Sequence, residues 1–318
     1  MKRLNGHRAL AAFSLGLILW LPAVQAQALI LLKPLYTISR AGTRVGELLN
    51  PQGLAIDPAG NVYVADTGNN RIQKFAPDGT PIAQMGGLGS GNQQFDAPLG
   101  ICASNGLFEW VADYNNQRLQ RLDRNLNAAG TLASDENWPL RFQFQLPVDV
   151  VESGQGDLFV ADGARNEVVK FDSFHKPVAV FGGLDTGEHR IQEIGKIALR
   201  ATERIFVSDR LTAAVLIFDY FGNFLGVLRC PDFQEPFGLA VWAQQALLFV
   251  SDAQSGRIFA FDVSGQNEPV RILDAGKQFR LKRPVALAVF KQKLFVLDEA
   301  TSQILVLGIE RIRTAGTR

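Results

Sequence analysis

The sequence of 318 residues predicts an all-β fold, a six-bladed β-propeller built from four-stranded antiparallel blades. Two observations support this prediction. A short apolar run that ends in aspartate recurs six times, and successive aspartates lie 47, 49, 47, 43 and 46 residues apart. Around each run, β-branched and aromatic residues are separated by Gly, Asn and Asp, a composition typical of short strands and turns. The six repeated aspartates are Asp66, Asp113, Asp162, Asp209, Asp252 and Asp298.

Each repeat unit contains enough sequence for four strands, which we name a, b, c and d from the centre of the ring outward. Strand a begins with a Pro-x-Gly-like element about fifteen residues before the aspartate, as in Pro51-Gln52-Gly53. The fourth unit departs from this pattern with Ile194-Gly195-Lys196. Strand b ends at the aspartate, and strands c and d follow after short polar turns. Because one blade cannot bury both of its apolar faces alone, the ring is expected to be one cooperative domain.

The two ends of the chain are predicted to close the ring. The last unit supplies only three strands, at residues 285–289, 293–298 and 303–307. The N-terminal segment 35–39 matches a d strand, and we expect it to complete the sixth blade and leave no free edge. The predicted domain boundaries are a signal peptide at 1–26, a linker at 27–34, the propeller at 35–312 and a tail at 313–318.

The first unit carries the clearest resemblance to a known family. The segment 51–75, PQGLAIDPAGNVYVADTGNNRIQKF, resembles the NHL-repeat family, and so does its continuation at 86–98. Units two, three and five share the pattern, whereas units four and six depart from it. The resemblance spans residues 35–309 and implies the propeller fold. It implies no single function, because the family includes protein-binding scaffolds, RNA-binding domains and a zinc-dependent peptide-amidating lyase.

The N-terminus predicts export from the cytoplasm. Three basic residues precede an apolar stretch at 9–21, and Val24-Gln25-Ala26 suits a signal peptidase that cuts before Gln27. An uncleaved anchor helix is the alternative, because residues 29–32 extend the apolar character. Cleavage would change the formal net charge from +1 to −2. We therefore expect a periplasmic or secreted protein without stable membrane insertion after cleavage.

Charge and cysteine content exclude two classes of function. Lys and Arg number 32 and Asp and Glu number 31, so bulk charge gives no reason to expect a nucleic-acid partner. The two cysteines cannot make a four-cysteine zinc site. Cys102 lies on an inner strand and Cys230 lies about half a ring away, beyond the ~7 Å Cα separation that a disulfide allows. Both are predicted to be free thiols, with Cys102 buried.

The repeated aspartates suggest catalysis or metal binding at first, but a structural role explains them better. A carboxylate at the end of strand b can accept hydrogen bonds from the backbone of the next turn, and one such role in every blade does not make a single active site. Arg71, Arg118 and Arg257 are expected to brace the turn between strands b and c.

The sequence contains few residues that could serve as metal ligands. The related zinc lyase would need about three histidines, whereas His175 and His189 are predicted to lie in loops on opposite faces of the ring. A channel calcium would need several oxygen ligands, and the channel positions of strand a are mostly apolar or small. The exceptions, Asp149 and Glu152, are weak metal candidates, and no cofactor is predicted.

The face that carries the d–a loops and the b–c turns is the predicted binding surface. Arginine and aromatic side chains are frequent anchors of protein interfaces, and these loops contain several of them. Four phenylalanines at matching positions, Phe95, Phe144, Phe233 and Phe279, are instead expected to fill the space between blades. The candidate binding residues are Trp138, Arg141, Phe142, Arg165, Arg210, Lys277 and Arg280.

Together these observations predict a non-enzymatic binding scaffold that presents its long-loop face to a protein or peptide, for example in a cell-envelope assembly. The alternative is a metal-dependent hydrolase or lyase with its site at the mouth of the central channel. The sequence does not indicate the oligomeric state.

Overall fold

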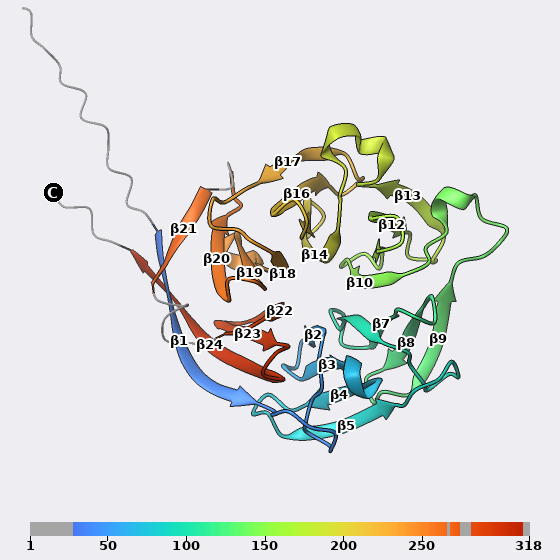
Figure 1. Cartoon of the computed structure of the whole chain (residues 1–318), viewed down its shortest axis with the longest axis horizontal. Coiled ribbons are helices and arrows are strands. Elements are labelled where there is room, and N and C mark those ends of the chain that lie inside the picture. Colours follow the sequence, from blue (N-terminus) through green and yellow to red (C-terminus); the bar gives the residue numbers. More distant parts are fainter. Residues whose placement is uncertain (1–27, 266–267, 274–280, 314–318) are drawn as a thin grey trace, which may run out of the picture.

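The computed structural model describes residues 28–265, 268–273 and 281–313. It is a ring of six four-stranded antiparallel blades around a central channel, as the sequence predicts (Figure 1). The predicted signal segment 1–26 and two candidate binding residues, Lys277 and Arg280, lie outside the described residues. Within the described ranges, no helix is both long and apolar enough to span a membrane.

The strands of the first three blades follow one another along the chain, from the inner strand to the outer one. They are β2 (Gly53–Ile56), β3 (Val62–Asp66), β4 (Arg71–Phe75) and β5 (Pro81–Gly86); β6 (Pro98–Cys102), β7 (Phe108–Asp113), β8 (Arg118–Asp123) and β9 (Ala128–Ala133); and β10 (Pro147–Glu152), β11 (Leu158–Asp162), β12 (Glu167–Phe171) and β13 (Pro177–Phe181).

The last three blades repeat the same order. They are β14 (Ile194–Arg200), β15 (Arg204–Asp209), β16 (Ala214–Asp219) and β17 (Phe224–Leu228); β18 (Pro236–Trp242), β19 (Leu247–Asp252), β20 (Arg257–Asp262) and β21 (Glu268–Leu273); and β22 (Pro284–Phe290), β23 (Lys293–Asp298), β24 (Gln303–Arg313) and β1 (Ala28–Ile38). Four short 3-10 segments lie in the connections: η1 (Thr67–Asn69), η2 (Leu140–Phe142), η3 (Leu184–His189) and η4 (Ala243–Gln245).

The core lies between neighbouring blades. Strand b is buried along its whole length in β3 and β11, and along all but its first residue in β7, β15 and β23, because it faces a blade on either side. The outer strand β5 is mostly exposed along its length. Between the third and fourth blades, Phe159 packs in one cluster with Ile205 and Phe218. Burial of such side chains on both faces of the middle strands joins the six sheets into one cooperative unit.

The N-terminal strand completes the sixth blade. β1 pairs antiparallel with β24, in a register that places Thr37 opposite Leu305 and Leu29 opposite Ile312. The predicted closure by an N-terminal strand is therefore confirmed. Pairing along this edge also removes the open strand that an incomplete blade would present.

The closing strand is longer than the sequence suggests, and this corrects the predicted boundaries. β1 begins at Ala28, so most of the segment 27–34 is a paired strand rather than a linker. Its first residues also pair in parallel with β21, with Leu29 opposite Arg271, which joins the fifth and sixth blades into one eight-stranded sheet. The physical reason is apolar packing, since Ile30 and Leu32 are buried in the core between these blades.

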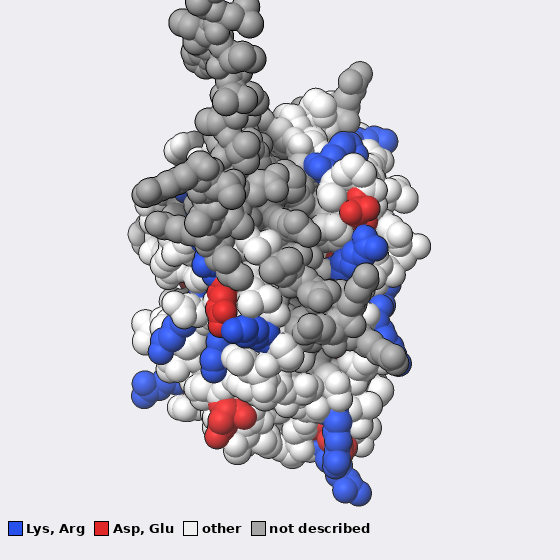
Figure 2. Space-filling view, turned by 90° about the vertical axis from the view of Figure 1, so that its left-hand side faces the viewer, with Lys and Arg blue, Asp and Glu red and all other residues white. Residues whose placement is uncertain are grey.

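Figure 2 views the side of the ring where the closing strand lies. Over the described part of this surface, basic side chains lie beside acidic ones at several points. Two ion pairs involve the ribbon made by β1 and β24. Lys33 Nζ lies 2.8 Å from Glu310 Oε1, and Arg311 Nη2 lies 3.9 Å from Asp262 Oδ2.

Candidate functional site

The repeated aspartates hold the long loops of one face against the blades. In the first blade, buried Asp66 accepts a hydrogen bond from the Leu49 backbone N–H at 2.7 Å, which fixes the incoming d–a loop. Arg71 Nε donates to the same carboxylate at 2.7 Å, and Asn69 donates at 2.8 Å. The second blade repeats this set with Asp113, whose carboxylate binds the Asp96 N–H and Arg118 Nε.

In the third blade Asp162 accepts hydrogen bonds from the Gln145 and Leu146 N–H groups, and Arg165 Nε lies 3.5 Å from its carboxylate. The last three blades keep the contact with the backbone and lose the arginine. Asp209, Asp252 and Asp298 each accept hydrogen bonds from two N–H groups of the preceding d–a loop and from one N–H group of the following b–c turn. Arg257 does not brace its turn as expected. It is exposed, and its ion-pair partner is Asp232, 3.8 Å away at the surface. The carboxylates thus bind backbone in every blade.

The loop between β9 and β10, residues 134–146, carries the densest group of candidate binding residues. Leu140 is 72% exposed, and Arg141 beside it is also exposed. Trp138 is half-buried, with its ring 5.6 Å from that of Phe171, and Phe142 is half-buried beneath the Arg141 guanidinium at 4.7 Å. The loop therefore exposes an apolar side chain, Leu140, and a cationic one, Arg141, next to the half-buried rings of Trp138 and Phe142.

Arg165 supports this loop from the next b–c turn. Its Nη1 donates a 2.7 Å hydrogen bond to the Leu140 carbonyl oxygen, and its Nη2 donates to the carbonyl oxygens of Arg141 and Gln143. The same guanidinium lies 2.7 Å from Glu167. Both Nη groups of Arg165 are thus bonded inside the molecule and hold the loop, and its contact with a partner stays a prediction.

Arg210 belongs to a charge network at the channel mouth on the same face. Its guanidinium pairs with Glu193 at 3.0 Å and with Glu235 at 2.6 Å. Arg283 reaches Glu235 from the sixth blade at 2.9 Å and also pairs with Glu299 at 2.9 Å. Burial raises the pKa of Glu235, but hydrogen bonds from Arg283 and Arg210 outweigh that effect and hold it below its usual value. The network links blades four, five and six.

The matching phenylalanines fill the gaps between blades where the structure describes them. Phe95, Phe144 and Phe233 are buried, in line with the expected packing role, and Phe279 lies outside the described residues. These three phenylalanines are therefore part of the packing between blades and not of the exposed surface.

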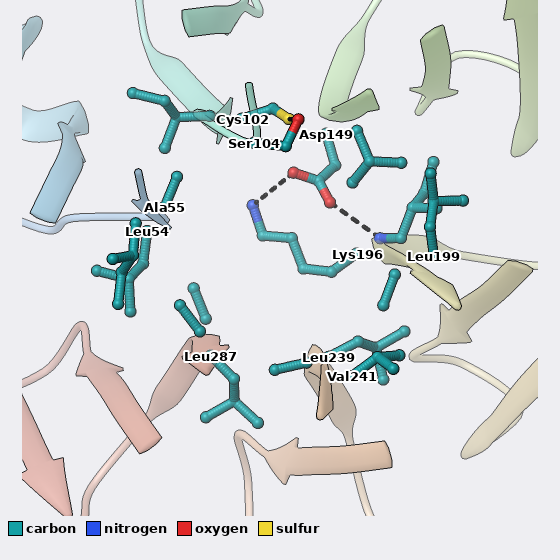
Figure 3. Close-up of a pocket in the computed structure, with 18 of the residues that line it drawn as sticks. Leu54, Ala55, Cys102, Ser104, Asp149, Lys196, Leu199, Leu239, Val241 and Leu287 are labelled. Carbon is teal, nitrogen blue, oxygen red and sulfur yellow. Dashed lines mark hydrogen bonds and ion pairs between the residues drawn. The ribbon is translucent and has the colours of Figure 1, made fainter. Parts of the chain in front are cut away.

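The side chains that line the central channel are mostly apolar, and one ion pair lies among them. Leu54, Ile101, Ala198, Leu239 and Leu287 line a cavity of about 270 Å³, as their positions on the inner strands predict (Figure 3). In the same cavity Lys196 Nζ lies 3.6 Å from Asp149 Oδ1, and the side chains of both residues are 8% exposed. The Ile197 backbone N–H donates to Asp149 Oδ2 at 2.9 Å. Burial raises the pKa of Asp149, and the lysine charge partly offsets that rise.

The two weak metal candidates have different partners. Asp149 binds Lys196, whereas Glu152 accepts a hydrogen bond from Asn105 Nδ2 at 2.6 Å. Burial raises the pKa of Glu152. Across the residues that the structure describes, no group of three or more His, Cys, Asp or Glu side chains is close enough to hold a metal ion.

His175 and His189 lie in the loop classes that the sequence predicts, on opposite faces. His175 is in the turn between β12 and β13 and packs edge-on against Trp110, with ring centres 5.1 Å apart. His189 ends η3 in a d–a loop and stacks on Phe224 at 4.4 Å. Each imidazole thus packs on an aromatic ring of its own surroundings.

Both cysteines are free thiols, as predicted. Cys102 is buried, which raises the pKa of its thiol, whereas Cys230 is partly exposed.

Sequence reasoning assigned no role to two charged residues, Lys196 and Glu109. Glu109 occupies a position of strand b where other units have Val62, Leu158 or Leu294, and it is fully buried. Burial raises the pKa of Glu109 to about 7, although nearby Lys74 favours its charged form. The signal was present in the repeat alignment, where one acid replaces an aliphatic residue.

Comparison with known proteins finds a family similarity in the first blade. Residues 48–75 match the model of the NHL repeat. The chain is 25% identical over 175 residues to human NHL repeat-containing protein 3, a match that covers 50% of this chain and 49% of that protein. It is 43% identical over 51 residues to the Caenorhabditis elegans protein lin-41, which covers 16% of this chain and 4% of lin-41. The matched part thus spans about half of the human relative.

Solved structures share the fold at low sequence identity. The PQQ-bound aldose sugar dehydrogenase of Streptomyces coelicolor has a TM-score of 0.62 at 14% identity, covering 90% of this chain and 99% of that chain. A virginiamycin B lyase from Staphylococcus aureus, solved with quinupristin, has a TM-score of 0.60 at 12% identity, covering 89% of this chain and 99% of that chain. These likenesses concern the fold alone. The chain is therefore a six-bladed β-propeller whose first blade matches the model of the NHL repeat.

Proposed function

We propose that this propeller is a non-enzymatic scaffold that binds a protein or peptide on its long-loop face. The observation that supports this most directly is the loop 134–146, where Leu140 is 72% exposed beside the exposed guanidinium of Arg141. An exposed leucine next to an arginine suits a partner segment with an apolar side chain and a carboxylate. The resemblance to a family that includes protein-binding scaffolds agrees with this proposal.

The loop is held in place before any partner arrives. Arg165 binds its backbone from below, and Gln143 Nε2 donates a 2.9 Å hydrogen bond to the Trp138 carbonyl oxygen. The Phe142 N–H also donates to the Pro139 carbonyl oxygen at 2.8 Å. A preorganised loop loses little conformational entropy on binding, which favours affinity.

A peptide library displayed on phage tests the proposal. Peptides selected on the purified propeller are expected to bind Leu140→Asp and Arg141→Glu at least about tenfold more weakly. Phe174→Asp is the matched control, because Phe174 is 83% exposed in a c–d turn on the opposite face. All three variants should keep the wild-type melting temperature. Selected peptides that bind all three equally, or that lose affinity only with Phe174→Asp, would contradict the proposal.

The enzyme alternative requires a bound metal ion. A metal-dependent hydrolase or lyase would retain its ion through purification, so stoichiometric zinc or calcium in the isolated protein would favour it. Phage-selected peptides would then compete with substrate only if the two sites overlapped.

We also propose that the protein is exported, which the basic and apolar composition of residues 1–26 supports. N-terminal sequencing of the protein from its own cells is expected to begin at Gln27. A mature chain that begins at Met1 would favour the anchor alternative or retention in the cytoplasm.

A further inference from the structure

Two neighbouring blades carry opposite charges where the other four carry the smallest residues. The position is the third residue of the element that opens each inner strand. Asp149 occupies it in β10 and Lys196 occupies it in β14. The equivalent residues of the other blades are Gly53, Gly100, Gly238 and Ala286. Because the third and fourth blades are adjacent, the two charges meet across a single interface inside the channel.

The pair leaves donor capacity on the lysine. Figure 3 shows the Lys196 side chain extending across the channel, with its ammonium group turned toward Asp149. The 3.6 Å between Nζ and Oδ1 is an ion-pair distance and exceeds that of a good hydrogen bond. An ammonium group has three donors, so Asp149 does not satisfy it alone. Both side chains line the cavity, and each is more than nine-tenths buried.

Ring closure does not require this pair. Four of the six equivalent positions close their interfaces with Gly or Ala. A buried ion pair also contributes little net stability, because desolvation of both charges offsets their attraction. Asp149 also accepts a hydrogen bond across this interface, from the Ile197 N–H of the fourth blade, and that bond needs no lysine. The buried ammonium group of Lys196 therefore calls for a role beyond joining the blades.

The rest of the cavity is mostly apolar, and the cavity is small. Leu54, Leu199, Leu239 and Leu287 form much of the wall (Figure 3). At about 270 Å³ the cavity lies near the lower end of the range for small-molecule sites. Its lining includes the residues at the ends of the inner strands, such as Ser104 and Val289, so it extends toward the a–b loops. That end is opposite to the long-loop face.

We propose that this cavity binds a small zwitterion with an apolar body, of the α-amino-acid class. The carboxylate of the ligand would pair with Lys196, its ammonium group with Asp149, and its side chain would contact the leucine walls. A ligand with one charge would satisfy one member of the pair and face a like charge on the other. A zwitterion matches both, and its apolar body suits the remaining surface.

Calorimetric titration of the whole protein with L-leucine tests the proposal. Two analogues dissect the head group: isocaproate lacks the ammonium group, and isoamylamine lacks the carboxylate. We expect L-leucine to bind and both analogues to bind at least about tenfold more weakly. Lys196→Met and Asp149→Asn should each weaken L-leucine binding by a similar factor. If isocaproate or isoamylamine binds as tightly as L-leucine, the zwitterion proposal is overturned.

A double variant separates ligand binding from a structural role. Asp149→Ala with Lys196→Ala copies the small residue found at Ala286. We expect it to stay folded, with a melting temperature lowered at most by the loss of the Asp149 hydrogen bond to the Ile197 N–H, while it loses L-leucine binding. A wild-type protein that binds none of leucine, isoleucine, valine, methionine and phenylalanine would overturn the proposal. Arg141→Glu on the other face is the control, and it should bind L-leucine like the wild type.

Discussion

Arg71 Nε donates a 2.7 Å hydrogen bond to Asp66 Oδ2, and this links strand c of the first blade to the end of its strand b. The arginine also binds the carbonyl oxygens of Arg44 and Glu47, at 2.8 Å each, in the loop that enters the blade. One charge pair therefore joins two strands and a long loop. The same arrangement recurs in the second blade and is absent from the fourth, where Ala214 stands at the arginine position.

The first prediction compares these two kinds of blade. Asp66→Ala leaves the nearly buried Arg71 without its counter-charge, so we expect a loss of about 3–5 kcal/mol in the free energy of unfolding. Asp209→Ala removes hydrogen bonds to backbone N–H groups and leaves no buried arginine behind, so we expect about 1–3 kcal/mol. Urea denaturation measures both. Equal losses would show that Arg71 adds nothing to the stability of this arrangement.

The second prediction concerns the pH dependence of stability. Glu109 is buried between the first two blades beside Tyr63 and Lys74, and its pKa is raised by burial from 4.5 to about 7. Between these values the folded protein holds a proton that the unfolded chain releases. Stability should therefore fall as pH rises from about 4.5 to 7, by up to about 3 kcal/mol from this group, and then level off.

Glu109→Gln isolates this contribution from those of other carboxyl groups. The variant should lose that part of the pH slope, which denaturation at pH 5 and pH 8 would measure, both pH values being about 1 to 2 units from the raised pKa. Glu109→Leu restores the type of residue found at Leu158 and Leu294, and it should be more stable than the wild type above pH 7. Parallel pH profiles for Glu109→Gln and the wild type would contradict the assignment.

Much of the fold follows from the sequence because the repeat is local. The aspartate that ends strand b and the proline that opens strand a recur in nearly every unit, so strand order and blade number could be predicted. The parallel pairing of Leu29 with Arg271 could not, since it occurs once and joins residues from opposite ends of the chain. Its signal was the apolar run at 29–32, which a membrane anchor explains equally well from sequence alone.

The candidate sites were harder to predict, for a related reason. Asp149 and Lys196 were visible as departures from the Gly pattern, but their pairing depends on the closeness of adjacent inner strands. Arg165 was expected on the surface because arginines are enriched at interfaces. Its hydrogen bonds to Leu140 and Gln143 depend on loop geometry, which no spacing in the sequence specifies.

The third prediction uses the two thiols as reporters. Cys230 is partly exposed and should react with iodoacetamide in the folded protein, whereas buried Cys102 with its raised pKa should react only after unfolding. Mass spectrometry should show one alkylated cysteine under native conditions and two in denaturant. Cys230→Ser is the control, and it should gain no label while folded. Rapid labelling of both thiols in the native protein would show that the interior of the second blade opens readily.

The fourth prediction tests how the loop 134–146 is held. Arg165→Ala removes three hydrogen bonds to loop carbonyl oxygens, so amide exchange at Phe142 and Gln143 should become about tenfold faster or more. Arg165→Lys keeps the charge but cannot reach several carbonyl oxygens at once, so it should restore protection only in part. Exchange in blades four to six should stay at wild-type rates in both variants. Unchanged exchange in the loop of Arg165→Ala would mean that Gln143 and the packing of Trp138 on Phe171 suffice to order it, and a loop ordered in that way would bind selected peptides with wild-type affinity.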